Sequence, residues 1–187
     1  MILSESNFLM YKLFNSSFTG LSIGILFSIY KPIDPEVYSV GGMVLAGAML
    51  IVAKFYKKLL NIRSFFWVTM LVESVMLMTI VTFMILKFSL ISALLIYCGY
   101  QLTFIFGGYL VRAETLVAHK KELLSKIDVY KQLGYFAGLG ASFLFYKLMD
   151  LGLEISDSKE QIEILHYLLL MLQMGIILLA IRSFKRV

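Results

Sequence analysis

The chain has 187 residues, a formal net charge of +5, 60% hydrophobic residues and only 16% charged residues. Soluble globular domains average about 45–50% apolar and 25% charged residues, so this composition predicts an all-α integral membrane protein. One cysteine, Cys98, and two distant histidines, His119 and His166, exclude an internal disulfide and predict no metal site. Motifs of serine hydrolases, zinc proteases and phosphate-binding loops are missing from the sequence, so we expect neither an enzyme nor a cofactor.

Six apolar stretches are long enough to cross a bilayer. A helix rises about 1.5 Å per residue and must cover roughly 30 Å of hydrocarbon. We therefore expect a single polytopic domain of six transmembrane helices, at 13–30, 37–55, 64–86, 88–111, 127–149 and 164–181. Asp34, Pro35 and Glu36 predict the start of the second helix, and Ser158 with Gln161 predicts a capping box before the sixth.

The lysines and arginines are distributed unevenly between the two sides of these spans. Thirteen of the 17 fall on one side, and only Lys31, Lys87, Lys147 and Lys159 fall on the other. Positively charged loops stay in the cytoplasm, so we expect both termini inside and a multi-pass protein of the inner membrane. Because topology explains the basic charge, we expect the lipid bilayer as the surrounding partner and no nucleic acid.

The first span carries a polar stripe. Asn15, Thr19 and Ser22 recur at helical spacing on one face, beside a second stripe that contains Gly20 and Gly24. The polar stripe predicts either a solute pathway or a surface where helices pack closely and form hydrogen bonds. Both interpretations place this face toward protein or water.

Two further spans hold polar side chains near their middle. A carboxylate such as Glu73 in the third span is costly within a membrane and must be paired, hydrated or protonated. It is a candidate proton acceptor or counter-charge for a cationic solute; alternatively, it is a structural group bonded to Asn15, to Gln101 or to a backbone carbonyl. Gln101 in the fourth span is a second candidate on the substrate or proton pathway.

The connection after the fourth span, 112–126, mixes both charge signs with leucines at helical spacing. It predicts that the fourth helix continues out of the membrane and that an amphipathic segment lies on the cytoplasmic surface. Arg112, Glu114 and Asp128 are candidates for an ion network that opens and closes as a cytoplasmic gate, or for a static ion cluster. We expect His166 to lie at the membrane interface.

Small residues at four-residue spacing occur in the second span, at Gly42 and Ala46, and in the fifth, at Gly134 and Gly138. Such spacing lets helix backbones approach closely. It predicts contacts either within the chain or with a second copy.

Taken together, the six spans, the basic loop from Lys54 to Arg63, the long charged loop and the glycine-rich fifth helix resemble one half of a major facilitator superfamily transporter. The loop keeps the basic residues of the family motif but lacks its aspartate and glycines, and the fifth helix lacks the family's Gly-Pro pair. The resemblance implies a six-helix half that pairs with a second half, as a parallel homodimer or with another chain. It further implies transport of a small solute by alternating access, at a site lined by the first and fourth helices.

Two other functions fit the same six helices. The chain resembles in size the substrate-binding membrane subunit of an energy-coupling vitamin transporter, in which Gly20 and Gly24 would contact the partner. It could also be an accessory membrane protein that moves no solute, with a dry interior.

Overall fold

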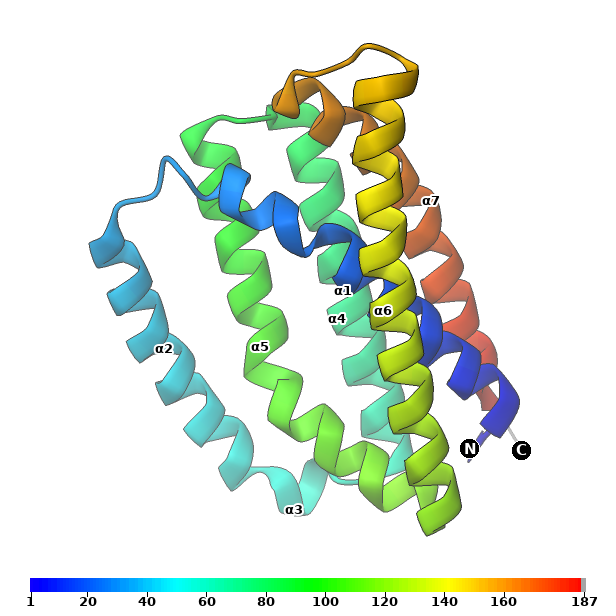
Figure 1. Ribbon diagram of the computed structural model, residues 1–187. Coiled ribbons are helices and arrows are strands. Elements are labelled where there is room, and N and C mark those ends of the chain that lie inside the picture. Colours follow the sequence, from blue (N-terminus) through cyan, green and yellow to red (C-terminus); the bar gives the residue numbers. More distant parts are fainter. Residues whose placement is uncertain (186–187) are drawn as a thin grey trace.

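The computed structural model describes residues 1–185 and consists almost entirely of helices (Figure 1). The predicted all-α fold is therefore confirmed. Arg186, one of the thirteen basic residues assigned to the inner side, lies outside the described residues. The helices are α1 (Glu5–Ile29), α2 (Pro35–Lys54), the single-turn α3 (Tyr56–Leu59), α4 (Ile62–Leu86), α5 (Leu90–Ala118), α6 (Lys121–Gly152) and α7 (Ser158–Ser183).

Four helices of the described chain, α2, α4, α5 and α7, are long and apolar enough to cross a membrane. This finding indicates a membrane protein. The other two long helices, α1 and α6, have 25 and 32 residues and therefore sufficient length. They carry more polar side chains, so their crossing of the membrane remains a proposal.

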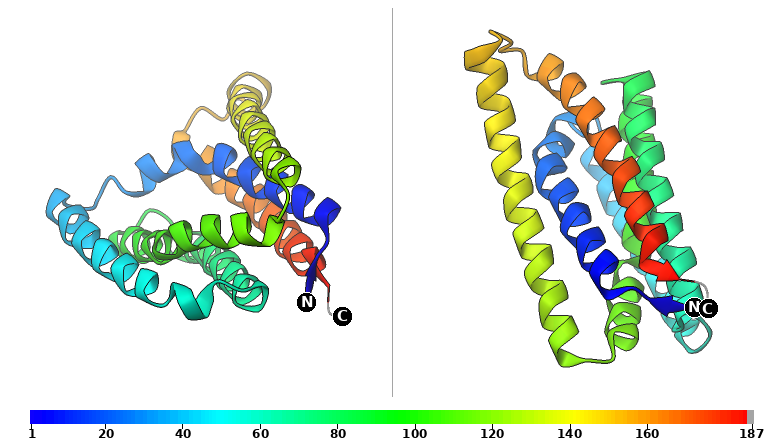
Figure 2. Two further views of the ribbon diagram at one scale, coloured as in Figure 1. Left: turned by 90° about the horizontal axis from the view of Figure 1, so that it is seen from below. Right: turned by 90° about the vertical axis from the view of Figure 1, so that its right-hand side faces the viewer.

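The two ends of the described chain lie side by side. The short strands β1 (Ile2–Leu3) and β2 (Phe184–Lys185) pair antiparallel, with Ile2 opposite Lys185. The six long helices alternate in direction, so α1 leaves this end of the bundle and α7 returns to it (Figures 1 and 2).

The main helix contacts follow a symmetric pattern. Helix α1 packs against α6 and α7, helix α5 packs against α2 and α4, and α4 packs against α7. Exchanging α1 with α5, α2 with α6, and α4 with α7 reproduces this same set of contacts. Each exchanged pair runs in opposite directions (Figure 1). The bundle is therefore arranged as two three-helix units of inverted orientation.

Helices α1 and α6 make the closest backbone approach in this pattern. A Cβ atom added to Gly134 or Gly138 of α6 would overlap the backbone of Leu13 or Ser17 in α1, and one on Gly20 would overlap the backbone of α6. Of the predicted contact residues, Gly20, Gly134 and Gly138 thus lie at an interface within the chain. Gly24 and Gly42 face open space and Ala46 is exposed.

Two predicted boundaries differ from the structure. Helix α5 continues to Ala118, in agreement with the predicted extension of the fourth helix, but α6 already begins at Lys121, so a turn at His119 (φ 51°) and Lys120 takes the place of a separate amphipathic segment. Ionic partners within the bundle allow the charged residues there to stay helical. The N-cap of α7 is Asp157 rather than Ser158, and the Gln161 side chain donates to the Ile155 carbonyl instead of completing a capping box.

Candidate functional site

The side chain of Glu73 lies at the centre of the bundle, where it is 1% exposed. Its Oε1 accepts hydrogen bonds from the Tyr11 hydroxyl at 2.6 Å and from Asn15 Nδ2 at 2.9 Å, both on α1. Its Oε2 accepts one from Gln173 Nε2 of α7 at 2.8 Å, and the same amide also donates to the Glu73 carbonyl at 3.0 Å. Three helices thus meet at one carboxylate.

All three partners of this carboxylate are donors. An ionised carboxylate only accepts hydrogen bonds, whereas a protonated one has a hydrogen to donate. The observed arrangement therefore suits the ionised form, and it satisfies the requirement that a buried charge be hydrogen-bonded. Uptake of a proton would require Tyr11 or an amide to turn.

A second buried polar cluster lies close by, toward the end of the bundle that holds the termini. Glu114 of α5 forms ion pairs with Lys12 of α1 and with Lys131 of α6, the latter at 2.6 Å. The Lys12 ammonium also lies over the rings of Phe8 and Tyr11, at 5.1 and 5.4 Å from their centroids. Glu114 thus holds three helices together at this end.

A cavity of about 260 Å³ adjoins the Glu73 cluster, between α1, α4, α5 and α7. Its mouth is marked by the exposed residues Thr19, Ile23 and Phe104, so it opens between α1 and α5. The polar residues that line it are Asn15, Thr19, Ser22, Tyr100, Thr103 and Gln173. Asn15 and Gln173 separate Glu73 from this space.

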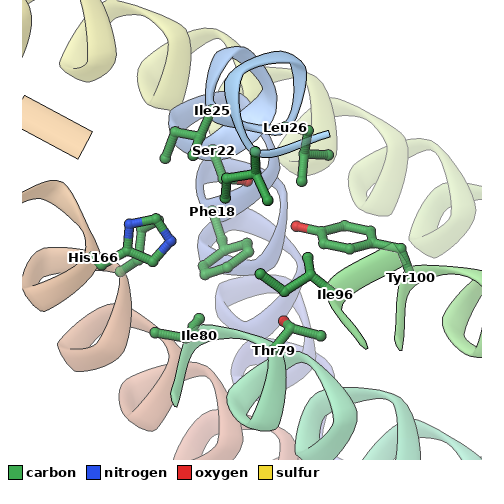
Figure 3. A pocket seen from close by; sticks show the side chains of 11 residues that line it. Phe18, Ser22, Ile25, Leu26, Thr79, Ile80, Ile96, Tyr100 and His166 are labelled. Carbon is green, nitrogen blue, oxygen red and sulfur yellow. The ribbon is translucent and has the colours of Figure 1, made fainter. Parts of the chain in front are cut away.

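A smaller cavity of about 20 Å³, with room for about one water molecule, lies farther from the termini. Phe18, Ser22 and Tyr100 line both cavities, and Figure 3 shows the Tyr100 hydroxyl pointing into the smaller one, across from His166. His166 is 4% exposed, and its ring stacks on Phe83 at 3.8 Å. Helix α7 therefore turns His166 into the bundle, and its depth relative to the membrane interface stays a prediction.

Comparisons with protein-family models, curated proteins and solved structures found no match. The functional argument therefore depends on where the structure places the candidate residues. Three of the predicted pathway residues, Asn15, Thr19 and Ser22, line the larger cavity, and Glu73 lies directly behind Asn15. Gln101 lies elsewhere, in an apolar groove between α2 and α5, where its Oε1 has no partner among the described residues.

Of the three predicted gate residues, the structure brings Glu114 and Asp128 to one ion cluster and leaves Arg112 outside it. Glu114 is buried in the ion cluster, and Asp128 lies at its exposed edge, 3.8 Å from Lys131. Arg112 is exposed and makes no ion pair within residues 1–185. The cations that bind Glu114 are instead Lys12 and Lys131.

Sequence reasoning missed several site residues, of which Tyr11, Gln173 and Tyr100 matter most. Tyr11 is four residues before Asn15 and continues its stripe, but the predicted span began after it. Gln173 is a lone amide in an apolar span, the same signal that singled out Gln101. Tyr100 gave no signal, because tyrosine is also common at the edges of membrane helices.

Proposed function

We propose that the chain is one half of a small-solute transporter with the architecture of a major facilitator superfamily half, and that two copies assemble as a parallel dimer in the inner membrane. The observation that carries this proposal is the symmetric helix packing around a cavity that opens between α1 and α5. Each half of that family contains two inverted three-helix repeats, and substrate binds between the halves. Both termini would lie in the cytoplasm, beside the basic residues.

The two peripheral helices support assembly with a second copy. No residue of α2 is buried, and α6 is buried along a single stripe that faces α1. Exposed small residues occur on both helices, including Gly42 and Ala46 on α2 and Ala137 and Gly140 on α6. In a two-fold dimer α2 of one copy would pack on α6 of its partner, which closes the cavity on its open side.

The Glu114 cluster supports alternating access between the copies. It ties α5 to α1 and α6 at the end of the bundle near the termini, whereas the described ion pairs at the opposite end, such as Lys87 with Glu163, are exposed. Breaking and reforming the Glu114 pairs would open and close the inner side. The gate would then consist of Lys12, Glu114 and Lys131.

Disulfide cross-linking between copies tests the dimer. Cys98→Ser removes the only cysteine, and Ala46→Cys with Ala137→Cys then places thiols on the exposed faces of α2 and α6. We expect oxidation in membranes to give a covalent dimer for the double variant and little for either single variant. Mixing the two single variants restores the cross-link in a two-fold dimer.

A matched pair on the opposite surface provides the control. Met78→Cys and Met171→Cys, on exposed positions of α4 and α7, are expected to leave the chain monomeric on the same gel. A chain that stays monomeric in membranes with every cysteine pair, and in native mass measurement, contradicts the homodimer. That result favours a substrate-binding subunit or an accessory protein instead.

A further inference from the structure

The hydrogen-bonding groups that face the larger cavity are mainly acceptors. Thr19 Oγ1 donates to the Asn15 carbonyl at 3.2 Å, and Thr103 Oγ1 donates to the Tyr100 carbonyl at 2.8 Å. Each hydroxyl has a single hydrogen, so both threonines have only lone pairs left for a ligand. Ser22 and Tyr100 hydrogen-bond each other, so one of their two hydroxyl hydrogens is already used and one remains to donate.

The Glu73 carboxylate orients the side-chain amides of Asn15 and Gln173 in the same way. Asn15 and Gln173 both point their NH₂ groups at the carboxylate, because a carboxylate cannot donate. Their oxygens accept no hydrogen bond from residues 1–185 and so are available to the cavity. The negative charge behind these amides also aligns their dipoles with the oxygen ends directed away from it.

Positive charge is kept away from this space. Neither lysine nor arginine lines the cavity. Lys12, whose charge also acts on Glu73, and Lys131 both bind Glu114 in the neighbouring cluster. Three aromatic side chains line the cavity, Phe18, Tyr100 and Phe104, and ring faces attract cations. The remaining lining residues are the aliphatic Ile23, Leu26, Val72 and Met76.

We infer that this cavity binds a small organic cation with a primary ammonium group, with Glu73 as its counter-charge behind Asn15 and Gln173. The ammonium has three donors and no acceptor, which matches the four available acceptor side chains. As a statement about the transported solute, the inference rests on the proposed function. Binding to the isolated chain does not depend on it.

Three ligands of similar shape and different charge test the inference: benzylammonium, benzyl alcohol and benzoate. Binding of each radiolabelled ligand is measured at neutral pH on the full chain in lipid nanodiscs, with empty nanodiscs subtracted. We expect benzylammonium to bind at least tenfold more tightly than the other two. Equal binding of benzyl alcohol, a preference for benzoate, or no binding of any ligand to folded protein overturns the inference.

Two variants locate the binding. Glu73→Gln is expected to weaken benzylammonium at least tenfold, because the counter-charge is gone and the two amides are free to turn. Should that variant fail to fold, Thr19→Lys places a fixed ammonium at the exposed mouth and is expected to abolish binding; Thr115→Lys, at an exposed position outside the cavity, is its matched control. Unchanged binding in folded Glu73→Gln or Thr19→Lys protein overturns the inference.

The two proposals fail in different ways. A monomeric chain that binds benzylammonium removes the dimeric transporter and keeps the cation site. A cross-linked dimer that binds none of the three ligands removes the cation site and keeps the dimer.

Discussion

At the scale of single residues, Glu114 is the counter-charge of two lysines at once. Its side chain is 6% exposed, and those of Lys12 and Lys131 are 12% and 27% exposed. Replacing Glu114 by Gln leaves the partly buried Lys12 ammonium without an anion and Lys131 with only the exposed Asp128, at 3.8 Å. We expect Glu114→Gln to lower the free energy of unfolding by about 3 kcal/mol, measured by denaturant titration in detergent micelles.

The pair formed by Glu163 and Lys87 offers the control for that measurement. It has a single Nζ to Oε2 contact of 2.7 Å, and the side chains of Lys87 and Glu163 are 59% and 34% exposed. Exposed ion pairs contribute little to stability. An equal loss of stability in Glu114→Gln and Glu163→Gln would show that the inner cluster has no special role.

Glu73 shows how much of a buried site can be predicted from the sequence. Glu73 is recognisable because a carboxylate in an apolar span is rare and costly. Of its partners, Asn15 was among those predicted. Tyr11 and Gln173 were not, because they lie 62 and 100 residues from Glu73 in the sequence. Hydrophobic periodicity places each residue on a face of its own helix but does not say which helices meet.

At the scale of helices, the contact between α1 and α6 depends on glycine. A Cβ on Gly138 would lie 2.9 Å from the carbonyl carbon and the Cα of Ser17, and backbone atoms cannot move aside as a flexible side chain can. We expect Gly138→Ala to force α1 and α6 apart and to cost about 1–3 kcal/mol in the free energy of unfolding.

Gly140, two residues along the same helix, is the matched control. A Cβ there meets nothing within 4 Å, and alanine forms helices more readily than glycine. Gly140→Ala is therefore expected to leave stability unchanged or slightly higher in the same titration. Similar destabilisation by both variants would mean that the close approach of α1 to α6 does not explain the Gly138 result.

The presence of each long helix could be predicted from the sequence, whereas some helix ends and the contacts between helices could not. Long apolar runs gave a helix at every predicted span, and Asp34 and Pro35 correctly placed the start of α2. The continuation of the fourth helix past Val111 was predicted, but its contacts were not, because the ionic partners of Glu114, Lys12 on α1 and Lys131 on α6, belong to other helices. The spacing of Gly134 and Gly138 indicated a close contact but did not distinguish α1 from a second copy.

At the scale of the whole molecule, the exchange of α1 with α5, α2 with α6, and α4 with α7 relates the exposed helices to each other. It pairs α2 with α6, each of which packs mainly against a single long helix, α5 and α1 respectively, on either side of the cavity between α1 and α5. An odd number of long helices would place the termini at opposite ends. Six place them at one end, and this allows two parallel copies to be joined by a short peptide.

A tandem fusion uses this arrangement as a test of the parallel dimer. The paired strands β1 and β2 put both ends of the described chain at one end of the bundle, so a flexible Gly-Ser linker of about 20 residues spans roughly 25 Å on average and can join two parallel copies. We expect the tandem to behave as a single particle and to take up benzylammonium into proteoliposomes at about the rate of the separate chains. Glu73→Gln in both copies of the tandem should lower that uptake at least tenfold, while Glu163→Gln in both should not. A tandem that folds and binds the cation yet associates into larger particles would contradict the parallel dimer. It would indicate that the exposed faces of α2 and α6 are not buried between the two linked copies.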